Sequence, residues 1–369
     1  MNHLFQPWKI GDLQLENRIV IPPLCQYSAN NGKVTEWHRM HWGNMMTSGA
    51  GLFIIEATGV SPEGRISPYC LGLWSDEMQN AMHEALTAVR QYSKMPIAIQ
   101  LAHAGRKAST YVPWESKEMG ERQIPPSDSL GWQTIAPSPI PFFENDNPPK
   151  EMRIEDIQRI IQAFGDAARR SDAVGIDAIE IHMAHGYLIH EFLSPLSNHR
   201  TDNYGGSLEN RMRFALEIYQ NVRKNFPAHK PVWVRISATD WAEGGWNVEE
   251  AAIFCKKLKE LGCPVIHVSS GSLILQQKIP VGAGYQTGLS QQIRQKVGIP
   301  TIAVGLITEP ELAESILATG QADAVAIGRA MMFNPHWPWV AARKLRQKVT
   351  APPQYSRSEP FPQQHIFKV

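Results

Sequence analysis

The chain contains eight short runs rich in β-branched residues, and longer stretches with helical character lie between them. Alternation of this kind is typical of βα units built around a parallel sheet. Because there are eight such runs, we expect a single closed (β/α)8 barrel, the TIM barrel of the α/β class, rather than an open sheet. The runs are 18–23, 52–57, 96–102, 177–182, 231–236, 264–269, 300–305 and 323–328.

The stretches between the runs support this fold. In 153–175, apolar residues recur at the i, i+3, i+4, i+7 spacing from Ile157 to Ala168, and Gly175 follows as a terminator. A second helix is predicted over 308–320. The strand runs are almost continuously apolar, as expected for a sheet that is covered on both faces.

Two segments depart from the alternation. Residues 105–150 form a long insertion after the third run, and its apolar content favours an ordered segment that caps the barrel mouth. Whether it only seals the mouth or also contacts substrate is left open. Residues 351–369 are too rich in proline for a helix and are predicted to be an extended tail, which leaves 1–350 as the barrel domain.

Composition narrows the class of protein. The chain has 369 residues, of which 43% are hydrophobic and 19% charged, with a formal net charge of +1. This balance gives no reason to expect nucleic acid or an anionic membrane as a partner, and no apolar run is long enough to cross a bilayer. Sparse cysteines without a C-x-x-C pair and the lack of a signal-peptide pattern predict a cytoplasmic protein. Its partners are expected to be small molecules.

In a barrel of this type, the active site lies where strands end and βα loops begin. Gly305 follows the seventh run, and Gly328 and Arg329 follow the eighth. Glycines allow a ligand to approach the backbone closely, and a guanidinium binds phosphate through two parallel hydrogen bonds. Each glycine alone would indicate only a tight turn, but together with Arg329 they predict a phosphorylated ligand.

Three histidines, His182, His185 and His190, surround the end of the fourth run. One hypothesis is a barrel metal-dependent hydrolase in which all three bind a metal, but such sites usually draw ligands from several strands, and the first run ends in Pro-Pro-Leu-Cys. The favoured hypothesis has no metal. In it, His182 and His185 donate hydrogen bonds to a carbonyl oxygen, and Tyr187 donates a proton.

Several blocks together resemble the Old Yellow Enzyme family of flavin ene-reductases. They are PPLCQYS at 22–28, QLAHAGRK at 100–107, EIHMAHGYLIHEFLSPLSNHRTDNYGGSLENR at 180–211, AVGLIT at 303–308 and AIGRAM at 326–331. The similarity continues in register from about residue 3 to residue 357. Cys25 with Tyr27 is similar to the bacterial subgroup of xenobiotic reductases and thermophilic-like enzymes.

The resemblance implies tightly but non-covalently bound FMN at the barrel mouth. It implies that the phosphate lies at Gly305, Gly328 and Arg329, and that Arg235 lies near N1 and the C2 carbonyl of the flavin, where a positive charge favours the reduced form. Gln100 would bind the pyrimidine edge. The full set of cofactor-binding residues that it implies is Pro22, Pro23, Leu24, Cys25, Ala57, Gln100, His182, Arg235, Val304, Gly305, Gly328 and Arg329.

The resemblance also implies the reaction. NADPH, or NADH, supplies a hydride to the flavin, which passes it to the C=C bond of an α,β-unsaturated carbonyl or nitro compound. His182 and His185 would bind the substrate oxygen, Tyr187 would protonate the α-carbon, and Tyr27 would add a hydrogen bond. Cys25 is expected to tune the flavin and contact substrate, although a lone cysteine is more often a small buried side chain.

Three further expectations concern details. Arg357 in the tail would reach the active site of a neighbouring subunit, in a homodimer or a higher even homo-oligomer. Met183 occupies a position where relatives often carry a smaller residue, which could narrow or reshape the pocket, and its effect is left open. A flavin-binding protein without turnover is retained as the second alternative to the ene-reductase, beside the metal-dependent hydrolase.

Overall fold

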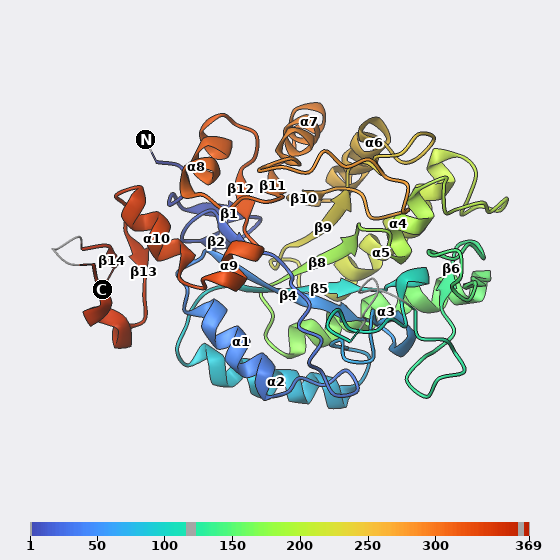
Figure 1. The fold of residues 1–369 in the computed structure, drawn as a ribbon, viewed down its shortest axis with the longest axis horizontal. Coiled ribbons are helices and arrows are strands. Elements are labelled where there is room, and N and C mark those ends of the chain that lie inside the picture. The colour runs from blue at the N-terminus through green and yellow to red at the C-terminus, as the bar shows by residue number, and fades with distance from the viewer. Residues whose placement is uncertain (1, 116–122, 361–364, 369) are drawn as a thin grey trace.

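Eight parallel strands close into a barrel in the computed structural model, which describes residues 2–115, 123–360 and 365–368 (Figure 1). The strands follow one another around the barrel in chain order, and each coincides with one of the eight predicted runs, so the predicted (β/α)8 fold is confirmed. The strands are β3 Ile19–Ile21, β4 Leu52–Gly59, β5 Ile97–Ala102, β8 Ala178–Met183, β9 Val232–Ser237, β10 Ile266–Ser269, β11 Thr301–Val304 and β12 Ala324–Ala326.

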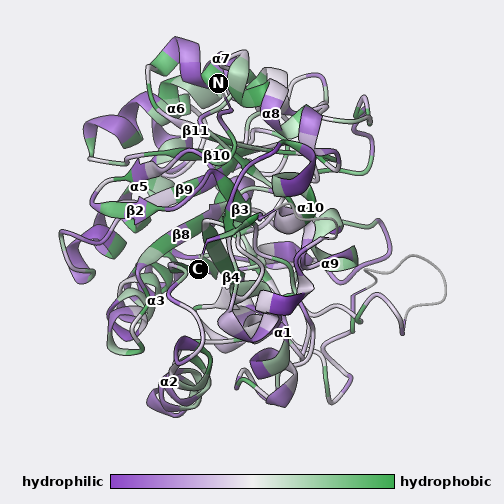
Figure 2. Ribbon diagram, turned by 90° about the vertical axis from the view of Figure 1, so that its left-hand side faces the viewer, coloured by the Kyte–Doolittle hydropathy of each residue, from purple (hydrophilic) through white to green (hydrophobic). Residues whose placement is uncertain are grey.

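Helices surround the barrel and bury its outer face. Figure 2 shows β3, β4 and β8 in the green of hydrophobic residues at the centre, with hydrophilic purple on the outer turns of the helices. The helices are α1 Glu36–Met46, α2 Asp76–Arg90, α3 Ile154–Ala173, α4 Leu188–Leu193, α5 Leu208–Asn225, α6 Val248–Glu260, α7 Thr287–Val297, α8 Pro310–Ala318, α9 Arg329–Phe333 and α10 Trp337–Lys344. No helix in the described ranges is long and apolar enough to cross a membrane.

The helix α3 illustrates why the sequence prediction succeeded. Its buried residues include Ile157, Ile160 and Phe164, which lie on the apolar stripe read from the sequence, and the chain leaves the helix through Gly175 at φ +88°. The second predicted helix, 308–320, corresponds to α8.

Shorter elements lie outside the barrel. They are the hairpin β1 Trp8–Ile10 with β2 Leu13–Leu15, the pair β6 Ile135–Ala136 with β7 Lys150–Glu151, the pair β13 Val349–Thr350 with β14 Phe367–Lys368, and the 3-10 helices η1 Pro62–Gly64, η2 Gly105–Lys107 and η3 Pro353–Ser358.

The C-terminal segment lies beside the barrel and departs from the expected extended tail in two places. Residues Pro353–Ser358 form the 3-10 helix η3, and β14 then returns to pair in parallel with β13. Phe367 is only 6% exposed and packs against the ring of Trp339 with centroids 4.9 Å apart. The proline content prevented an α-helix, but buried aromatic packing brings the end of the chain back to the domain.

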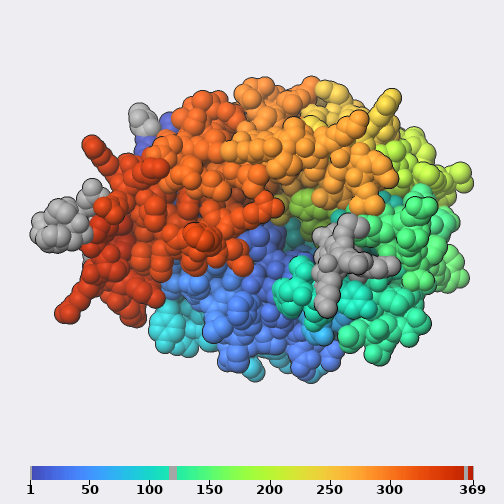
Figure 3. Space-filling view, viewed as in Figure 1, coloured from blue at the N-terminus to red at the C-terminus, as the bar shows by residue number. Residues whose placement is uncertain are grey.

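The base of the long insertion is tied to the barrel mouth. Arg106 donates to the carbonyl oxygen of Leu273 at 2.7 Å, and Lys107 donates to the carbonyl oxygens of His185 and Ser272, both at 3.1 Å. The insertion therefore meets the loops that follow β8 and β10. In Figure 3 the face of the molecule is hollowed near its middle, where blue, green and orange segments of the chain meet.

The turn after β8 is fixed by unusual backbone conformations. His185 and Gly186 have φ of +60° and +71°, in the left-handed region that disfavours side chains. A Cβ at Gly186 would collide with the carbonyl oxygen of Ser272. The turn therefore requires glycine at this position both for its dihedral angles and for its close approach to the loop after β10.

A buried acid supports the segment after β3. Glu56 on β4 is 3% exposed and accepts the backbone N–H of Gln26 at 2.8 Å. Its other oxygen faces Nε2 of His38 at 3.5 Å. Burial raises the pKa of Glu56 to about 8, and burial lowers the pKa of His38 to about 4, so both groups are mostly neutral at pH 7.

We predict that Gly186→Ala lowers the free energy of unfolding by about 3 kcal/mol, because left-handed strain and a backbone collision add together. Gly175→Ala is the matched control: Gly175 also has a positive φ, but a Cβ there meets nothing within 4 Å. The control should lose only about 1 kcal/mol. Urea unfolding of both variants measures the difference, and equal losses would contradict the proposed collision.

We predict that Glu56→Gln changes how stability depends on pH. An unfolded glutamate ionises near 4.5, whereas folded Glu56 ionises near 8. Protonated Glu56 therefore makes its full contribution to the free energy of unfolding below pH 4.5. This contribution is lost as pH rises toward 8, at up to about 1.4 kcal/mol per pH unit. The wild type should lose stability relative to Glu56→Gln between pH 5 and 8 in urea unfolding.

The exposed Glu144 supplies the control for this pH experiment. Glu144→Gln should keep the wild-type pH dependence. A free-energy difference between wild type and Glu56→Gln that stays constant from pH 5 to 8 would show that Glu56 is not held protonated by the fold.

Candidate active site

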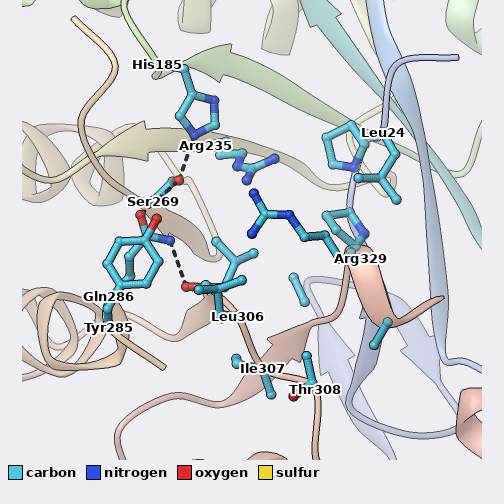
Figure 4. Close-up of a pocket in the computed structure, with 17 residues that line it drawn as sticks. Leu24, His185, Arg235, Ser269, Tyr285, Gln286, Leu306, Ile307, Thr308 and Arg329 are labelled. Atoms are coloured by element: carbon cyan, nitrogen blue, oxygen red, sulfur yellow. Dashed lines mark hydrogen bonds between the residues drawn. The ribbon is translucent and has the colours of Figure 1, made fainter. Parts of the chain in front are cut away.

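A cavity of about 230 Å³ lies at the carboxyl ends of the barrel strands (Figure 4). Its walls come from the segments after β3, β8, β11 and β12, from β9 and β10, and from the loop before α7. Eight of the predicted cofactor-binding residues line it: Pro22, Pro23, Leu24, Arg235, Val304, Gly305, Gly328 and Arg329. These eight residues come from the ends of four strands, β3, β9, β11 and β12, and are brought together at one place although they span most of the chain.

Two arginines point into this cavity (Figure 4). Arg235 is only 8% exposed, and neither guanidinium makes a hydrogen bond or salt bridge to any residue that the structure describes; Nε of Arg235 is buried without a partner. Burial lowers the pKa of Arg235, but arginine remains charged in proteins. A buried cation without a partner is costly, so the cavity is suited to a ligand that carries negative charge.

The rim of the cavity lets a ligand approach the backbone at Gly305. Its φ is +131°, a conformation that side chains rarely adopt, and a Cβ would come within 2.8 Å of Nε2 of Gln286. Leu306 beside it also has a positive φ, +49°. Strained backbone of this kind collects at ligand-binding sites. Gly305 and Arg329 thus provide the two features expected of a phosphate site.

The predicted histidine pair is present and is hydrogen-bonded in a defined direction. The backbone N–H of Ala184 donates to Nδ1 of His182 at 3.2 Å, so the proton of a neutral His182 lies on Nε2, which is 3.3 Å from Nδ1 of His185. His185 therefore carries its proton on Nε2, which is 2.7 Å from Oγ of Ser269. The chain of donors runs from His182 through His185 to Ser269.

Both histidines are neutral at physiological pH. Burial, followed by the charge of Arg235, lowers the pKa of His182 and of His185 well below the ordinary value. Neutral imidazoles donate hydrogen bonds without adding to the positive charge that Arg235 and Arg329 bring to the cavity. The ring of Tyr187 lies edge-on to His182 with centroids 5.0 Å apart, and Nζ of Lys107 is 5.2 Å from the Tyr187 ring.

Cys25 and Tyr27 follow β3. Burial, followed by the nearby Cys70 and Glu56, raises the pKa of the Cys25 thiol well above its usual value, so the group is a thiol rather than a nucleophilic thiolate. Tyr27 has φ +49° and meets the ring of Trp114 from the insertion edge-on, with centroids 5.9 Å apart. Neither residue lines the cavity of Figure 4.

His190 does not join the other two histidines. Its ring is fully buried on α4, where Nδ1 accepts the backbone N–H of Gly186 at 2.9 Å and Nε2 lies 2.9 Å from Asp240. Within the described ranges, no three histidine, cysteine or acidic side chains come together in a way that could hold a metal ion. The three-histidine site of the hydrolase hypothesis is therefore not assembled.

Other predicted residues lie away from the cavity lining. Ala57 and Gln100 are paired neighbours on β4 and β5, and Gln100 donates through Nε2 to Glu180 at 2.7 Å. Arg357 is exposed on η3. Met183 is fully buried in the hydrophobic core and is not among the residues that line this cavity, because successive residues of a strand face opposite sides and His182 takes the inner one.

Sequence reasoning also missed residues that line the cavity. Ser269 ends β10, so its position at a strand end was a usable signal. Tyr285 and Gln286 precede α7 in a loop with no recognisable motif, although Gln286 accepts from Ser270 at 2.6 Å and donates to the carbonyl oxygen of Val304 at 2.8 Å. No sequence pattern predicted this link between two loops.

The sequence is similar to that of other proteins over almost its whole length. An NADPH dehydrogenase of Geobacillus thermodenitrificans (strain NG80-2) is 45% identical over 360 residues, which are 97% of this chain and 99% of that protein. Among solved structures, an old yellow enzyme homologue from Zymomonas mobilis is 28% identical with a TM-score of 0.75, and the similarity covers 94% of each chain. Morphinone reductase is 27% identical with a TM-score of 0.76, covering 100% of this chain and 94% of that one.

A family model agrees with these similarities and with the geometry of the cavity. It matches residues 3–348 and describes the NADH:flavin oxidoreductase / NADH oxidase family. The match includes all eight barrel strands and each residue that lines the cavity. The chain therefore belongs to the NADH:flavin oxidoreductase / NADH oxidase family and is a flavin-dependent oxidoreductase of the Old Yellow Enzyme type.

Proposed function

We propose that this protein is an NADPH-dependent ene-reductase that reduces the C=C bond of α,β-unsaturated carbonyl or nitro compounds with FMN as its cofactor. The observation that carries the proposal is the pair of neutral, buried imidazoles, His182 and His185, beside a cavity whose buried cation, Arg235, has no hydrogen-bonding partner among the residues that the structure describes. The names of the relatives, NADPH dehydrogenase and morphinone reductase, agree with it.

The residues of the cavity fit FMN. Arg329 and the backbone at Gly305 and Gly328 would hold the phosphate, and Arg235 would lie where negative charge gathers on the reduced ring. Pro22, Pro23, Leu24 and Val304 would provide apolar and backbone contacts. Gln100, Ala57 and Cys25 are proposed to contact the ring from the neighbouring strand ends. The orphaned Nε of Arg235 supports this fit, because an anionic partner would remove the cost of burying it.

Bound FMN would supply the redox chemistry, taking a hydride from NADPH and returning it to the β-carbon of the alkene. The protein would contribute the polarising groups. His182 and His185 would give their N–H groups to the substrate oxygen in place of the bonds that they now make to each other and to Ser269. Donors of this kind contribute about 3 kcal/mol each in other enzymes.

Tyr187 is proposed as the proton donor to the α-carbon, since its ring packs against His182 at the edge of the histidine pair. Tyr27 would add a hydrogen bond to the substrate oxygen. Cys25, as a thiol, would tune the flavin and contact substrate rather than act as a nucleophile.

Assembly and location complete the proposal. We propose a homodimer or a higher even homo-oligomer in the cytoplasm, in which the exposed Arg357 on η3 would reach the cavity of a neighbouring subunit.

Trp114 and Phe142 of the insertion would form part of the substrate side of the cavity. Trp114 meets Tyr27, and the ring centroid of Phe142 lies 4.5 Å from Nζ of Lys107.

An anaerobic titration tests the proposal. The purified protein should be yellow, NADPH should bleach the flavin absorbance, and cyclohexenone or a nitroalkene should restore it. Absence of flavin absorbance even after incubation with FMN would refute the proposal. Bleaching by NADPH without reoxidation by any alkene would instead favour a flavin-binding protein without turnover.

We predict that Tyr187→Phe slows reoxidation by the alkene about 100-fold or more, because a positioned general acid is removed, and leaves reduction by NADPH nearly unchanged. Stopped-flow absorbance measures the two half-reactions separately. His182→Ala and His185→Ala serve as comparison variants and should weaken binding of enones and phenols while FMN stays bound. Equal slowing of both half-reactions by Tyr187→Phe would remove Tyr187 from the role of proton donor.

A further inference from the structure

A single buried carboxylate collects three donors inside the barrel. Glu180 on β8 is fully buried; one oxygen accepts Nε2 of Gln100 at 2.7 Å, and the other accepts Nε1 of Trp233 at 2.8 Å and Nδ1 of His267 at 2.7 Å. The four side chains come from β5, β8, β9 and β10. Groups from four adjacent strands are thus fixed to one another by Glu180.

Glu180 carries a full negative charge. Burial alone would raise its pKa, but His267, Arg235 and the indole of Trp233 outweigh burial and lower the pKa to about 2. Nδ1 of His267 faces this carboxylate at 2.7 Å, and burial lowers the pKa of the His267 ring while Glu180 raises it.

The charge of Glu180 acts on Arg235. Strand register pairs Glu180 with Trp233 and His182 with Arg235, and residues two apart on a strand share a face. Glu180 thus lies one layer deeper in the barrel than Arg235. Burial lowers the pKa of Arg235 and Glu180 raises it, so the carboxylate is the leading opposite charge that this cation feels, without forming an ion pair with it.

We propose that Glu180 is a positioning residue that sets the strength of the positive field at the cavity and, by binding Nε2 of Gln100, fixes the orientation of the Gln100 amide. Its charge opposes that of Arg235 and therefore holds the reduction potential of a bound flavin below the value that Arg235 alone would give. This inference rests on the proposed binding of FMN in the cavity of Figure 4.

The direction in which Glu180 shifts the reduction potential follows from the charge of the reduced flavin. Reduced flavin carries more negative charge beside Arg235 than oxidised flavin does, so a nearby carboxylate destabilises the reduced form more. Replacing Glu180 with the isosteric glutamine removes that charge while an amide oxygen still accepts from Trp233 and His267. The Gln100 amide can flip to accept from the new NH2 group, so the hydrogen bonds inside the cluster are retained while the orientation that Glu180 imposes on Gln100 is reversed.

The experiment is a potentiometric titration of the FMN-bound protein. In Glu180→Gln, the ratio of the dissociation constants of oxidised and reduced FMN should rise about tenfold, which corresponds to a midpoint potential about 30 mV more positive for a two-electron couple. Glu180→Asp keeps the charge and should restore the wild-type potential. An unchanged or more negative potential in Glu180→Gln would overturn the proposal.

A matched control separates charge from the loss of a buried acid. Glu191 is also fully buried, but burial raises its pKa to about 8, so Glu191→Gln at pH 7 removes little charge and should leave the potential unchanged. An equal positive shift in both variants would also overturn the proposal. If Glu180→Gln fails to fold, the double variant with Trp233→Phe relieves crowding around the new amide and should show the same positive shift.

The outcome also distinguishes this inference from the proposed function. A wild-type protein that never binds FMN would overturn both. A protein that binds FMN and reduces enones, but whose potential does not rise in Glu180→Gln, would overturn the role of Glu180 alone. A positive shift in a protein that reduces no alkene would support the role of Glu180 and refute the ene-reductase.

Discussion

The closure of eight parallel strands is the constraint on which the rest of this molecule depends. Closure leaves no sheet edge, and parallel order directs every strand's carboxyl end to one mouth. Arg235, Ser269 and Gly305 therefore meet in one cavity although none is close to another in sequence. Closure also creates an interior with little room for water. Polar groups that point inward must therefore form hydrogen bonds with groups on neighbouring strands. Glu180 does so by accepting hydrogen bonds from Gln100, Trp233 and His267.

Charge inside the barrel is distributed unevenly along its axis. Glu180 has its hydrogen bonds satisfied by three donors, whereas Arg235, one layer nearer the mouth, has no hydrogen bond within the described part of the chain. A buried guanidinium without a hydrogen bond lowers the free energy of unfolding, and binding of an anionic group would offset that cost. The two layers thus have different roles: the deeper one holds strands in place, and the upper one is left incomplete until a ligand arrives.

The sequence predicted the barrel and much of the cavity because both follow from strand periodicity and from residues at strand ends. Gly305, Gly328 and Arg329 were found in this way, and the resemblance to a known family added Arg235 and others. Gln286 was not found, because its position depends on how the loop before α7 folds back to Val304. The place of Met183 in the core was not predicted, because the prediction did not apply the alternation of faces along β8. The return of Phe367 to Trp339 likewise depends on tertiary packing that proline content does not reveal.

The histidine pair would connect this architecture to the proposed reaction. In the free protein, the proton of His182 points to His185 and that of His185 points to Ser269, so each donor is already used. A substrate oxygen must therefore compete with bonds inside the protein, and its net gain is smaller than two new hydrogen bonds would suggest. An oxygen that gains negative charge during the reaction strengthens its hydrogen bonds, whereas Ser269 does not. The cost of breaking the internal bonds would be the same for the neutral ground state and the charged transition state, so the stronger bonds to the charged oxygen would supply the difference that catalysis requires.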